Sequence, residues 1–498
     1  MSNTVNAQRK ITSKDICTII GVLIIYLFGY ICPAFGGITP LGMKMLGVLI
    51  GLIFMTCAGC NIIASSAFAL LAFVFHGYYD AATLVATWVG STTTFQLIFC
   101  GALCVAMRES GAMDVVAKKM LTSKVCKGRP LVLILMLMLA GFCVSIFVAG
   151  APFFLLFFGL LDSIMQISGY KRTDPIYPLV LLSVYVSQYG AFMLPWKGAM
   201  AVTVAMFNSV LEPYGFVFND WLYMFIQLVT WVGFDVIFVL VLKFVFKADV
   251  SKLASIDMSK VEAFQNVPDK FDFNMKVSLG SLLFCVVYIL GTSLLPKTFP
   301  GYSYIAGFGT TLIWLIPLTL FTVLRKDGKP IMNMAALAQK SSLWMMIALV
   351  GSLTMLGKVC TDNELGIRGW LVSVFTPLFG NMSIWALLLL VVVFTTVITQ
   401  VVNGQVLTMG LTPVVAPIVC AMILDQGVAA NPTVVLTVLS SAASVAFLTV
   451  SGSVNAAYLL GRDEVTQKFV WTKGTIVLCI YMFWQYVVAL LCNFIFAA

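Results

Sequence analysis

Long, almost uninterrupted apolar segments are the feature of this sequence that most limits its fold. A helix of about 20 apolar residues crosses the ~30 Å hydrocarbon core of a bilayer, because its backbone groups all bond within the helix. Hydrophobic residues make up 61% of the 498 positions and charged residues only 10%, whereas soluble domains contain ~45–50% and ~25%. The chain has too few polar residues to cover a soluble surface, so the sequence predicts an all-α polytopic membrane protein.

The apolar segments predict about 11 transmembrane crossings and two re-entrant hairpins. The segment 176–210 is longer than one span requires, and residues 194–198, Leu-Pro-Trp-Lys-Gly, are the natural place for a break. The segments 130–168 and 383–424 are expected to return to the side from which they enter. The candidate segments are 16–35, 42–57, 61–77, 92–108, 130–168, 176–210, 221–243, 276–295, 303–324, 342–358, 383–424, 432–461 and 473–497.

The charges of the loops agree with this arrangement, because Lys and Arg concentrate on the cytoplasmic side of membrane proteins. If the N-terminus is cytoplasmic, 24 of the 29 basic residues fall inside. The exceptions are Lys197, which lies within a span, and four residues outside: Lys44, Lys297, Lys358 and Arg368. We therefore expect a multi-pass protein of the plasma (inner) membrane, surrounded by lipid. The basic run 118–129 is expected to form an amphipathic helix on the cytoplasmic surface.

Composition excludes several other functions. The chain contains 13 Cys and one His, and the Cys57–Cys60 pair lacks the second pair or the nearby His that a metal or redox site needs. His76 is interpreted as an interfacial residue at the end of a span. The net charge of +9 is spread over loops, so nucleic acid is not an expected partner. No GxxxxGK[ST] motif occurs, and no nucleophile–base arrangement suggests an enzyme.

The two halves of the sequence resemble each other. Residues 101–108, 148–152 and 195–198 correspond to residues 351–358, 401–405 and 451–455, at offsets of about 250 to 256 positions. With the predicted number of crossings, corresponding segments of the two halves cross the membrane in opposite directions. The two halves are therefore expected to be inverted repeats, a common construction in secondary transporters. The predicted organisation is a cytoplasmic tail (1–15), a first repeat (16–243, with hairpin 130–168 and broken span 176–210), a cytoplasmic linker (244–275) and a second repeat (276–498, with hairpin 383–424 and broken span 432–461).

A helix that ends in the sequence Gly-Ala-Met-Asp-Val-Val-Ala-Lys-Lys-Met (111–120) is followed by a hairpin with a small or polar tip and then by a broken span. With its repetition near the C-terminus, this arrangement resembles the divalent anion/sodium symporter family of the ion transporter superfamily. The chain resembles a divergent member, because its hairpin tips lack the family's Ser-Asn-Thr and read Ala-Gly-Ala-Pro (149–152) and Asn-Gly-Gln (403–405). The resemblance implies a homodimer in which a transport domain slides against a scaffold, the elevator mechanism.

The breaks give the candidate substrate site. Helices that begin near mid-membrane after positions 150, 197, 404 and 452 would direct unpaired N–H groups and partial positive charge at one point, which favours an anion. The glycines allow sharp turns and close backbone approach, and the polar side chains are able to orient carboxylate oxygens. The predicted substrate-binding residues are Ala149, Gly150, Ala151, Pro152, Lys197, Gly198, Asn403, Gly404, Gln405, Ser451, Gly452, Ser453 and Asn455.

Lys197 is a cation deep in a span, which normally faces a cavity or a counter-charge. Three interpretations stay open. Lys197 contacts the substrate, its ammonium replaces a sodium ion in the first half-site, or it has a structural role, by snorkelling or by pairing with a carboxylate such as Asp235 or Asp162. The second interpretation leaves one candidate sodium site, at Asn403, Ser451 and Asn455. No bound cofactor is expected, and the coupling ion is Na⁺ or H⁺.

The expected function is secondary active transport of small organic anions, most plausibly carboxylates, by symport or exchange. A cation/proton antiporter of the same superfamily is the first alternative, and a non-transporting membrane protein is the second. An antiporter needs a cluster of intramembrane carboxylates, and Asp162 and Asp235 are the clear candidates. For Asp235 itself, a structural partner or a hydrogen-bonded protonated acid is the preferred interpretation over a proton relay.

Overall fold

The computed structural model describes residues 12–256, 261, 264–265, 267–295, 298–326, 328–340, 344–370, 373 and 382–497. Most of the predicted tail 1–15 and the predicted outside residue Lys297 therefore lie outside the described residues. Helices make up almost all of the regular structure in these ranges, and two strands of two residues each, β1 (Arg325–Lys326) and β2 (Lys329–Pro330), pair in a small hairpin. The helical membrane class predicted from composition is confirmed in this coarse form.

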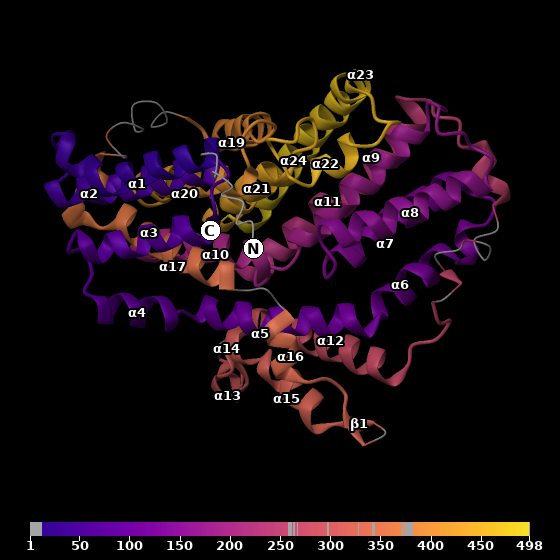
Figure 1. Cartoon of the computed structure of the whole chain (residues 1–498), viewed down its shortest axis with the longest axis horizontal. Coiled ribbons are helices and arrows are strands. Elements are labelled where there is room, and N and C mark those ends of the chain that lie inside the picture. Colours follow the sequence, from indigo (N-terminus) through magenta and orange to yellow (C-terminus); the bar gives the residue numbers. More distant parts are fainter. Residues whose placement is uncertain are drawn as a thin grey trace, which may run out of the picture.

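In Figure 1, helices at the two ends and at the bottom of the view surround a middle part that contains α10, α11, α19 and α21. The helices α1 to α4, α17 and α20 lie at one end, α6 to α9 lie at the other, and α12 to α16 project below α5. In chain order the helices are α1 (Ser13–Ile31), α2 (Pro40–Cys57), α3 (Ile62–Phe75), α4 (Ala81–Val89), α5 (Thr92–Ser110), α6 (Ala112–Leu121), α7 (Pro130–Ser145), α8 (Ala151–Ile167), α9 (Tyr177–Ser187), α10 (Gly198–Leu211), α11 (Asp220–Phe244), α12 (Phe273–Leu294), α13 (Tyr302–Ala306), α14 (Gly309–Leu312), α15 (Leu315–Val323), α16 (Met334–Lys340), α17 (Trp344–Thr361), α19 (Ile384–Ile398), α20 (Gly404–Leu424), α21 (Pro432–Ser444), α22 (Ala456–Leu460), α23 (Gln467–Phe469) and α24 (Thr475–Phe496).

Helix boundaries follow local capping chemistry. Side chains such as Thr39, Asn61, Asn219 and Ser383 accept bonds from the first-turn N–H groups of α2, α3, α11 and α19, which satisfies donors that the helix itself leaves unpaired. Proline occupies the first turn of α2, α7, α8 and α21, where its missing N–H costs nothing. These signals fix where each apolar run begins to be helical.

By length and apolar composition, α1, α11, α20 and the segment Gln467–Phe496 qualify as membrane spans within the described ranges. The α4–α5 pair, bent by 40° at Gly90–Ser91, makes a fifth span if it is counted as one. Eight more apolar helices have 10 to 17 residues. The predicted total of 11 crossings stays a prediction.

The hairpin segments consist of paired shorter helices. The arms α7 and α8 meet at the turn 146–150, and α19 and α20 meet at 399–403. The arms α7, α8 and α19 have 15 to 17 residues, or about 22–26 Å at 1.5 Å per residue, which is less than the ~30 Å hydrocarbon core. In the broken spans, α9 ends at Ser187 and α10 begins at Gly198, while α21 ends at Ser444 and α22 begins at Ala456.

Three local expectations were wrong. Segment 303–324 is not one helix but α13, α14 and α15, because Gly307 ends α13 and Gly309 has a φ of +59°. The amphipathic helix expected at 118–129 ends at Leu121 as α6, and Gly128 has a φ of +70°. His76 is buried, with 7% exposure, and its Nε2 lies 3.1 Å from the Ile25 carbonyl oxygen.

The linker 244–275 packs on the first repeat. Leu253, Val261 and Phe264 are buried, and the Tyr170 hydroxyl, between α8 and α9, donates to the Asp249 carbonyl at 2.9 Å. Farther along the linker, Asp269 pairs with Lys118 of α6 at 2.7 Å. The linker therefore lies against the hairpin and α6.

Candidate functional site

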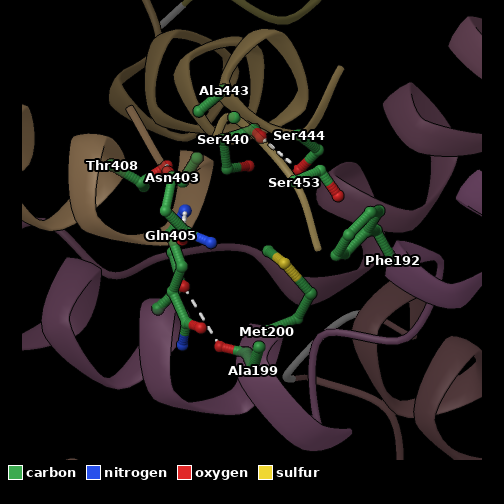
Figure 2. A pocket seen from close by; sticks show the side chains of 13 residues that line it. Phe192, Ala199, Met200, Asn403, Gln405, Thr408, Ser440, Ala443, Ser444 and Ser453 are labelled. Atoms are coloured by element: carbon green, nitrogen blue, oxygen red, sulfur yellow. Dashed lines mark hydrogen bonds between the residues drawn. The ribbon is translucent and has the colours of Figure 1, made fainter. Parts of the chain in front are cut away.

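A cavity of about 140 Å³ lies where the tip of the second hairpin, the second broken span and the start of α10 meet. Figure 2 shows Gln405 and Asn403 on one side of it, Ser440 and Ser444 above, and Phe192 and Met200 on the other side. The lining consists of Phe192, Ala199, Met200, Thr203, Asn403, Gly404, Gln405, Thr408, Ser440, Ala443, Ser444, Gly452 and Ser453. Residues from both repeats therefore build one cavity.

Two glycines let the second hairpin touch the second broken span. A Cβ added to Gly404 would lie 1.8 Å from the Ala443 carbonyl oxygen, and one added to Gly452 would lie 2.2 Å from the Thr399 carbonyl oxygen. Separations below 3.0 Å are essentially never seen for real Cβ atoms. The backbones of the two segments therefore meet at distances that only glycine allows.

Gln400 holds the non-helical backbone after α21. Its Oε1 accepts from the N–H groups of Phe447 and Leu448, each at 3.2 Å, and its Nε2 donates to the Val445 carbonyl. The Thr399 hydroxyl donates to the Ala443 carbonyl. Since backbone groups inside a membrane protein have little water to bond to, these side chains supply the partners that a helix would otherwise provide.

The polar groups at the cavity suit a negatively charged ligand. The first turns of α10 and α20 both line it, through Ala199 and Met200 and through Gly404 and Gln405, so two helix N-termini place partial positive charge there. The Gln405 Nε2 is buried and has no hydrogen-bond partner. A carboxylate oxygen is the kind of acceptor that these donors lack.

The hydroxyls of the lining mostly donate to their own helices. The Thr408, Ser440 and Ser444 hydroxyls bond to the carbonyls of Gly404, Thr437 and Ser440. Each such oxygen keeps acceptor capacity, which would suit a ligand hydroxyl, a water molecule or a cation. The lining contains no charged side chain.

The first repeat uses the same bonding scheme with different residues. The Ser145 hydroxyl donates to the Ser187 carbonyl at 3.1 Å, as Thr399 does to Ala443 in the second repeat. These donors are 254 positions apart and the acceptors 256. The hydrogen bonds thus follow the offset that the sequence comparison indicated.

Lys197 takes part in this scheme. Its ammonium donates to the Ile146 carbonyl at the end of α7, and the Thr449 hydroxyl donates to the Gln400 carbonyl in the second repeat. The Phe147 ring centroid lies 6.0 Å from the ammonium. Lys197 is half-buried and immediately precedes α10, but its side chain points to the first hairpin and does not line the cavity.

Lys197 does not pair with Asp162, one of the carboxylate partners that the sequence analysis left open. Asp162 accepts from Arg462 at 2.6 Å and from the Tyr177 hydroxyl at 2.6 Å, and Arg172 lies 3.9 Å away. Arg462 also pairs with Glu464 at 3.2 Å. This cluster joins the first hairpin to the loop that follows the second broken span.

Five predicted site residues line the cavity: Asn403, Gly404, Gln405, Gly452 and Ser453. Gly150 is the N-cap of α8, and its neighbours Ala149 and Pro152 are exposed. Outside the cavity lining lie Ala149, Gly150, Ala151, Pro152, Lys197, Gly198, Ser451 and Asn455.

The three residues of the candidate sodium site have separate partners. The Asn403 Oδ1 caps α20 by accepting from the Gln405 N–H at 3.0 Å. The Ser451 hydroxyl lies 2.9 Å from that of Thr449, and the Asn455 amide donates to the Gln188 Oε1 at 2.8 Å. Of the three, only Asn403 contributes to the cavity lining.

The fourth helix start differs from the expectation. The chain stays non-helical from Val445 to Asn455 because Gln400 and Thr449 hold it, so α22 begins at Ala456 and not after Gly452. With five residues, α22 is also short. Three long helices, α8, α10 and α20, therefore begin at the breaks.

Sequence reasoning did not identify eight lining residues: Phe192, Ala199, Met200, Thr203, Thr408, Ser440, Ala443 and Ser444. A signal existed for some of them, because the run Ser-Ser-Ala-Ala-Ser (440–444) directly precedes the break. Phe192, Met200 and Thr203 lie in apolar sequence that gives no such signal.

Comparison with solved structures finds a transporter. The YdaH transporter of Alcanivorax borkumensis superposes with a TM-score of 0.54 at 12% identity, over 91% of this chain and 97% of that chain. The two chains share a fold. No family model matches the chain, and no curated protein matches it.

Proposed function

We propose that this protein is a secondary active transporter of small organic anions, most plausibly carboxylates. The observation that carries the proposal is the cavity between the repeats, where the N-termini of α10 and α20 and the unpartnered Gln405 Nε2 converge. The shared fold with a transporter supports the same conclusion. Anion binding at converging helix N-termini is a recurring device of transporters with discontinuous helices.

The size of the cavity favours a small solute. Its ~140 Å³ is well below the ~300–1,000 Å³ of pockets for drug-sized ligands. The ligand's charge would be balanced by the dipoles of α10 and α20. A mono- or dicarboxylate with a short carbon chain fits these limits.

The transport cycle we infer is alternating access of the elevator type, by symport or exchange. The hairpins and broken spans, with α11 packed against α7, α9 and α21, would form the moving body. The helices α1 to α5 with α12 to α17 would hold most of the scaffold of a homodimer. Bonds within the proposed moving body support this division, since Gln400 and the Asp162–Arg462 pair join its parts. The family we propose is the divalent anion/sodium symporters, as a divergent member.

We propose at most one sodium-binding site. In the first repeat, the Lys197 ammonium bonds a backbone carbonyl, as a sodium ion would. In the second repeat, neutral hydroxyls of Thr449 and Ser451 occupy the corresponding region. Any sodium ion that takes part would therefore bind on the side of the second repeat.

A cation/proton antiporter is the weaker alternative. It needs paired intramembrane carboxylates, whereas Asp162 is neutralised by Arg462 at 2.6 Å. Asp235 lies on α11 and does not belong to the Asp162–Arg462 cluster. No carboxylate occurs among the described residues that line the cavity.

Counterflow in proteoliposomes tests the proposal. Vesicles loaded with an unlabelled short-chain carboxylate should accumulate the labelled solute transiently. Gln405→Met should weaken apparent affinity by ~10-fold or more, because a hydrogen bond to a charged group contributes ~1.5–3 kcal/mol. Gln166→Met, at an exposed position of α8, is the matched control and should behave as wild type. Absence of counterflow across a panel of organic anions would overturn the proposal.

A further inference from the structure

Asp235 is an acid that the proposed binding site does not use. It lies in the interior of α11, one of the helices that qualify as membrane spans. Its side chain is 1% exposed, and its Oδ2 has no hydrogen-bond partner. A charged carboxylate oxygen without a partner is strongly disfavoured in such a place, so burial favours the neutral acid.

Among the described residues, the elements that pack most extensively against α11 carry no buried cation. No Lys, Arg or His occurs in the sequences of α7, α9, α21 or α24, the helices packed against α11. Lys243 of α11 and Lys276 of α12 are both exposed. The titratable groups on the packed elements are the neutral thiols and phenols Cys143, Tyr177, Tyr185, Tyr189, Cys479, Tyr481, Tyr486 and Cys492, together with Cys285 and Tyr288 of α12.

Tyr481 packs edge-on against Phe234, with ring centroids 5.2 Å apart. Asp220, the other acid of α11, is four helical turns away and accepts from the Trp196 indole at 2.7 Å. None of these groups is a cation that could pair with Asp235 as a structural partner, one of the two roles that the sequence analysis preferred for it.

A buried polar network connects the helix of Asp235 with the cavity. The Ser441 hydroxyl, next to the cavity residue Ser440, donates to the Gln227 Oε1 at 2.9 Å. The Trp231 indole donates to the same oxygen at 2.9 Å. Trp231 precedes Asp235 by one helical turn, and its ring stacks between those of Tyr189 and Tyr481.

Further unpartnered groups lie along this network. Thr230 Oγ1 and Gln485 Nε2 are buried and without hydrogen-bond partners, and both residues are 0% exposed. Gln485 Oε1 accepts from Tyr481, whose hydroxyl also bonds the Ser441 carbonyl. Unpaired polar groups at such depth are sites for water when a membrane protein changes conformation.

We propose that Asp235 is the binding site for a proton that is co-transported with the anion. The inference rests on the proposed transport function and names its coupling ion. A proton added to the carboxylate gives a neutral acid, so the loaded body crosses the membrane without an exposed charge at this position. An anion bound while Asp235 is ionised would place two negative charges in the body, so the half-loaded body moves least and the two fluxes are coupled.

Uptake driven by a pH gradient tests the proposal. In wild-type proteoliposomes, an external pH one unit below the internal pH should raise accumulation by up to about tenfold, at one proton per anion. Asp235→Asn, a neutral mimic of the protonated acid, should keep counterflow but lose the response to the gradient. Asp174→Asn, in a cytoplasmic loop, is the control and should respond as wild type.

Asp235→Glu retains an acid and should keep the gradient response with a shifted pH profile. A gradient response of Asp235→Asn equal to that of wild type would overturn the assignment, and so would a wild type that ignores the gradient. Counterflow that is absent from every variant would instead overturn the transport function.

Infrared difference spectroscopy decides the assignment without transport. Wild-type protein at neutral pH should show the carbonyl stretch of a protonated carboxylic acid, and that band should be missing from Asp235→Asn. An identical spectrum in the variant would show that Asp235 does not carry the proton. Wild-type pH titration of the same band provides the measurement if the variant fails to fold.

Discussion

In the first repeat, Ser145 and Lys197 hold the end of α7 against the broken span, by bonds to Ser187 and Ile146. In the second repeat, Thr399, Gln400 and Thr449 hold the end of α19 against the other broken span in the same way. The scheme is shared, but its chemistry is not. The first repeat uses a cation, and the second uses neutral hydroxyls and an amide.

The two repeats contribute differently to the cavity. The tip of the second hairpin places Asn403, Gly404 and Gln405 on the cavity, whereas Ala149 and Pro152 of the first tip are exposed and away from it. The second repeat and α10 therefore form the cavity. The first repeat contributes a fixed positive charge through Lys197 and a permanent attachment of its hairpin.

Gln400→Leu should have the largest effect, because it removes the partners of three backbone groups in the second repeat. Each buried group left unpaired costs about 1–3 kcal/mol, so we expect a loss of about 3–5 kcal/mol in the free energy of unfolding. Ser145→Ala in the first repeat should cost about 1–2 kcal/mol. Thermal unfolding of the purified proteins measures both, and equal losses would contradict the division between the repeats.

Gly404→Ala should come next. Its Cβ would lie 1.8 Å from the Ala443 carbonyl oxygen, so the hairpin tip must move and binding should be lost, with a destabilisation of about 2–4 kcal/mol. The matched change Gly198→Ala meets no atom within 4 Å and has only a φ of +52° to overcome, at about 1 kcal/mol. Ligand-induced thermal shifts compare the two, and a Gly404→Ala protein that binds normally would refute the close contact.

Lys197→Ala should reduce transport in sodium-free buffer by ~10-fold or more, since it removes the cation that bonds the Ile146 carbonyl. Sodium should restore part of the rate by occupying the vacated position. Thr449→Ala, its counterpart in the second repeat, should lower the rate less and gain no new sodium response. Initial uptake rates at several sodium concentrations provide the measurement. Normal transport by Lys197→Ala at every concentration would rule out both cationic interpretations of this lysine.

Asn455→Leu should have the smallest effect. The Asn455 amide bonds Gln188 at 2.8 Å and connects the two breaks directly. A double-mutant cycle with Gln188→Leu should give a coupling free energy of about 0.5–1.5 kcal/mol. Additive effects would mean that the breaks are held together by their backbones alone.

Much of the fold could be read from the sequence, because apolar runs and capping residues are local signals. The starts of α8 and α10 were indicated by Gly150, Pro152 and Lys197, and that of α20 by Asn403. The start of α22 was not predictable, since Gln400, some 50 residues earlier in the chain, keeps the intervening backbone from forming a helix. Long-range hydrogen bonds of this kind leave no local pattern.

The candidate site was predictable in part for the same reason. Glycine and polar residues within apolar spans indicated the second hairpin tip and the second broken span. Five of the residues predicted there line the cavity. Phe192, Met200 and Thr203 were missed because apolar residues in a span look the same whether they face a cavity or lipid. Lys197 was recognised as unusual, but its carbonyl partner depends on how the first hairpin folds back.

The hydrogen bonds from Gln400 to the backbone beyond α21 limit how the second hairpin can move. Gly404 and Gly452 leave no space between the second hairpin and that backbone, so the hairpin cannot lift away as an independent flap without breaking several bonds at once. Opening the chamber would therefore require the second hairpin and the second broken span to move together as one piece.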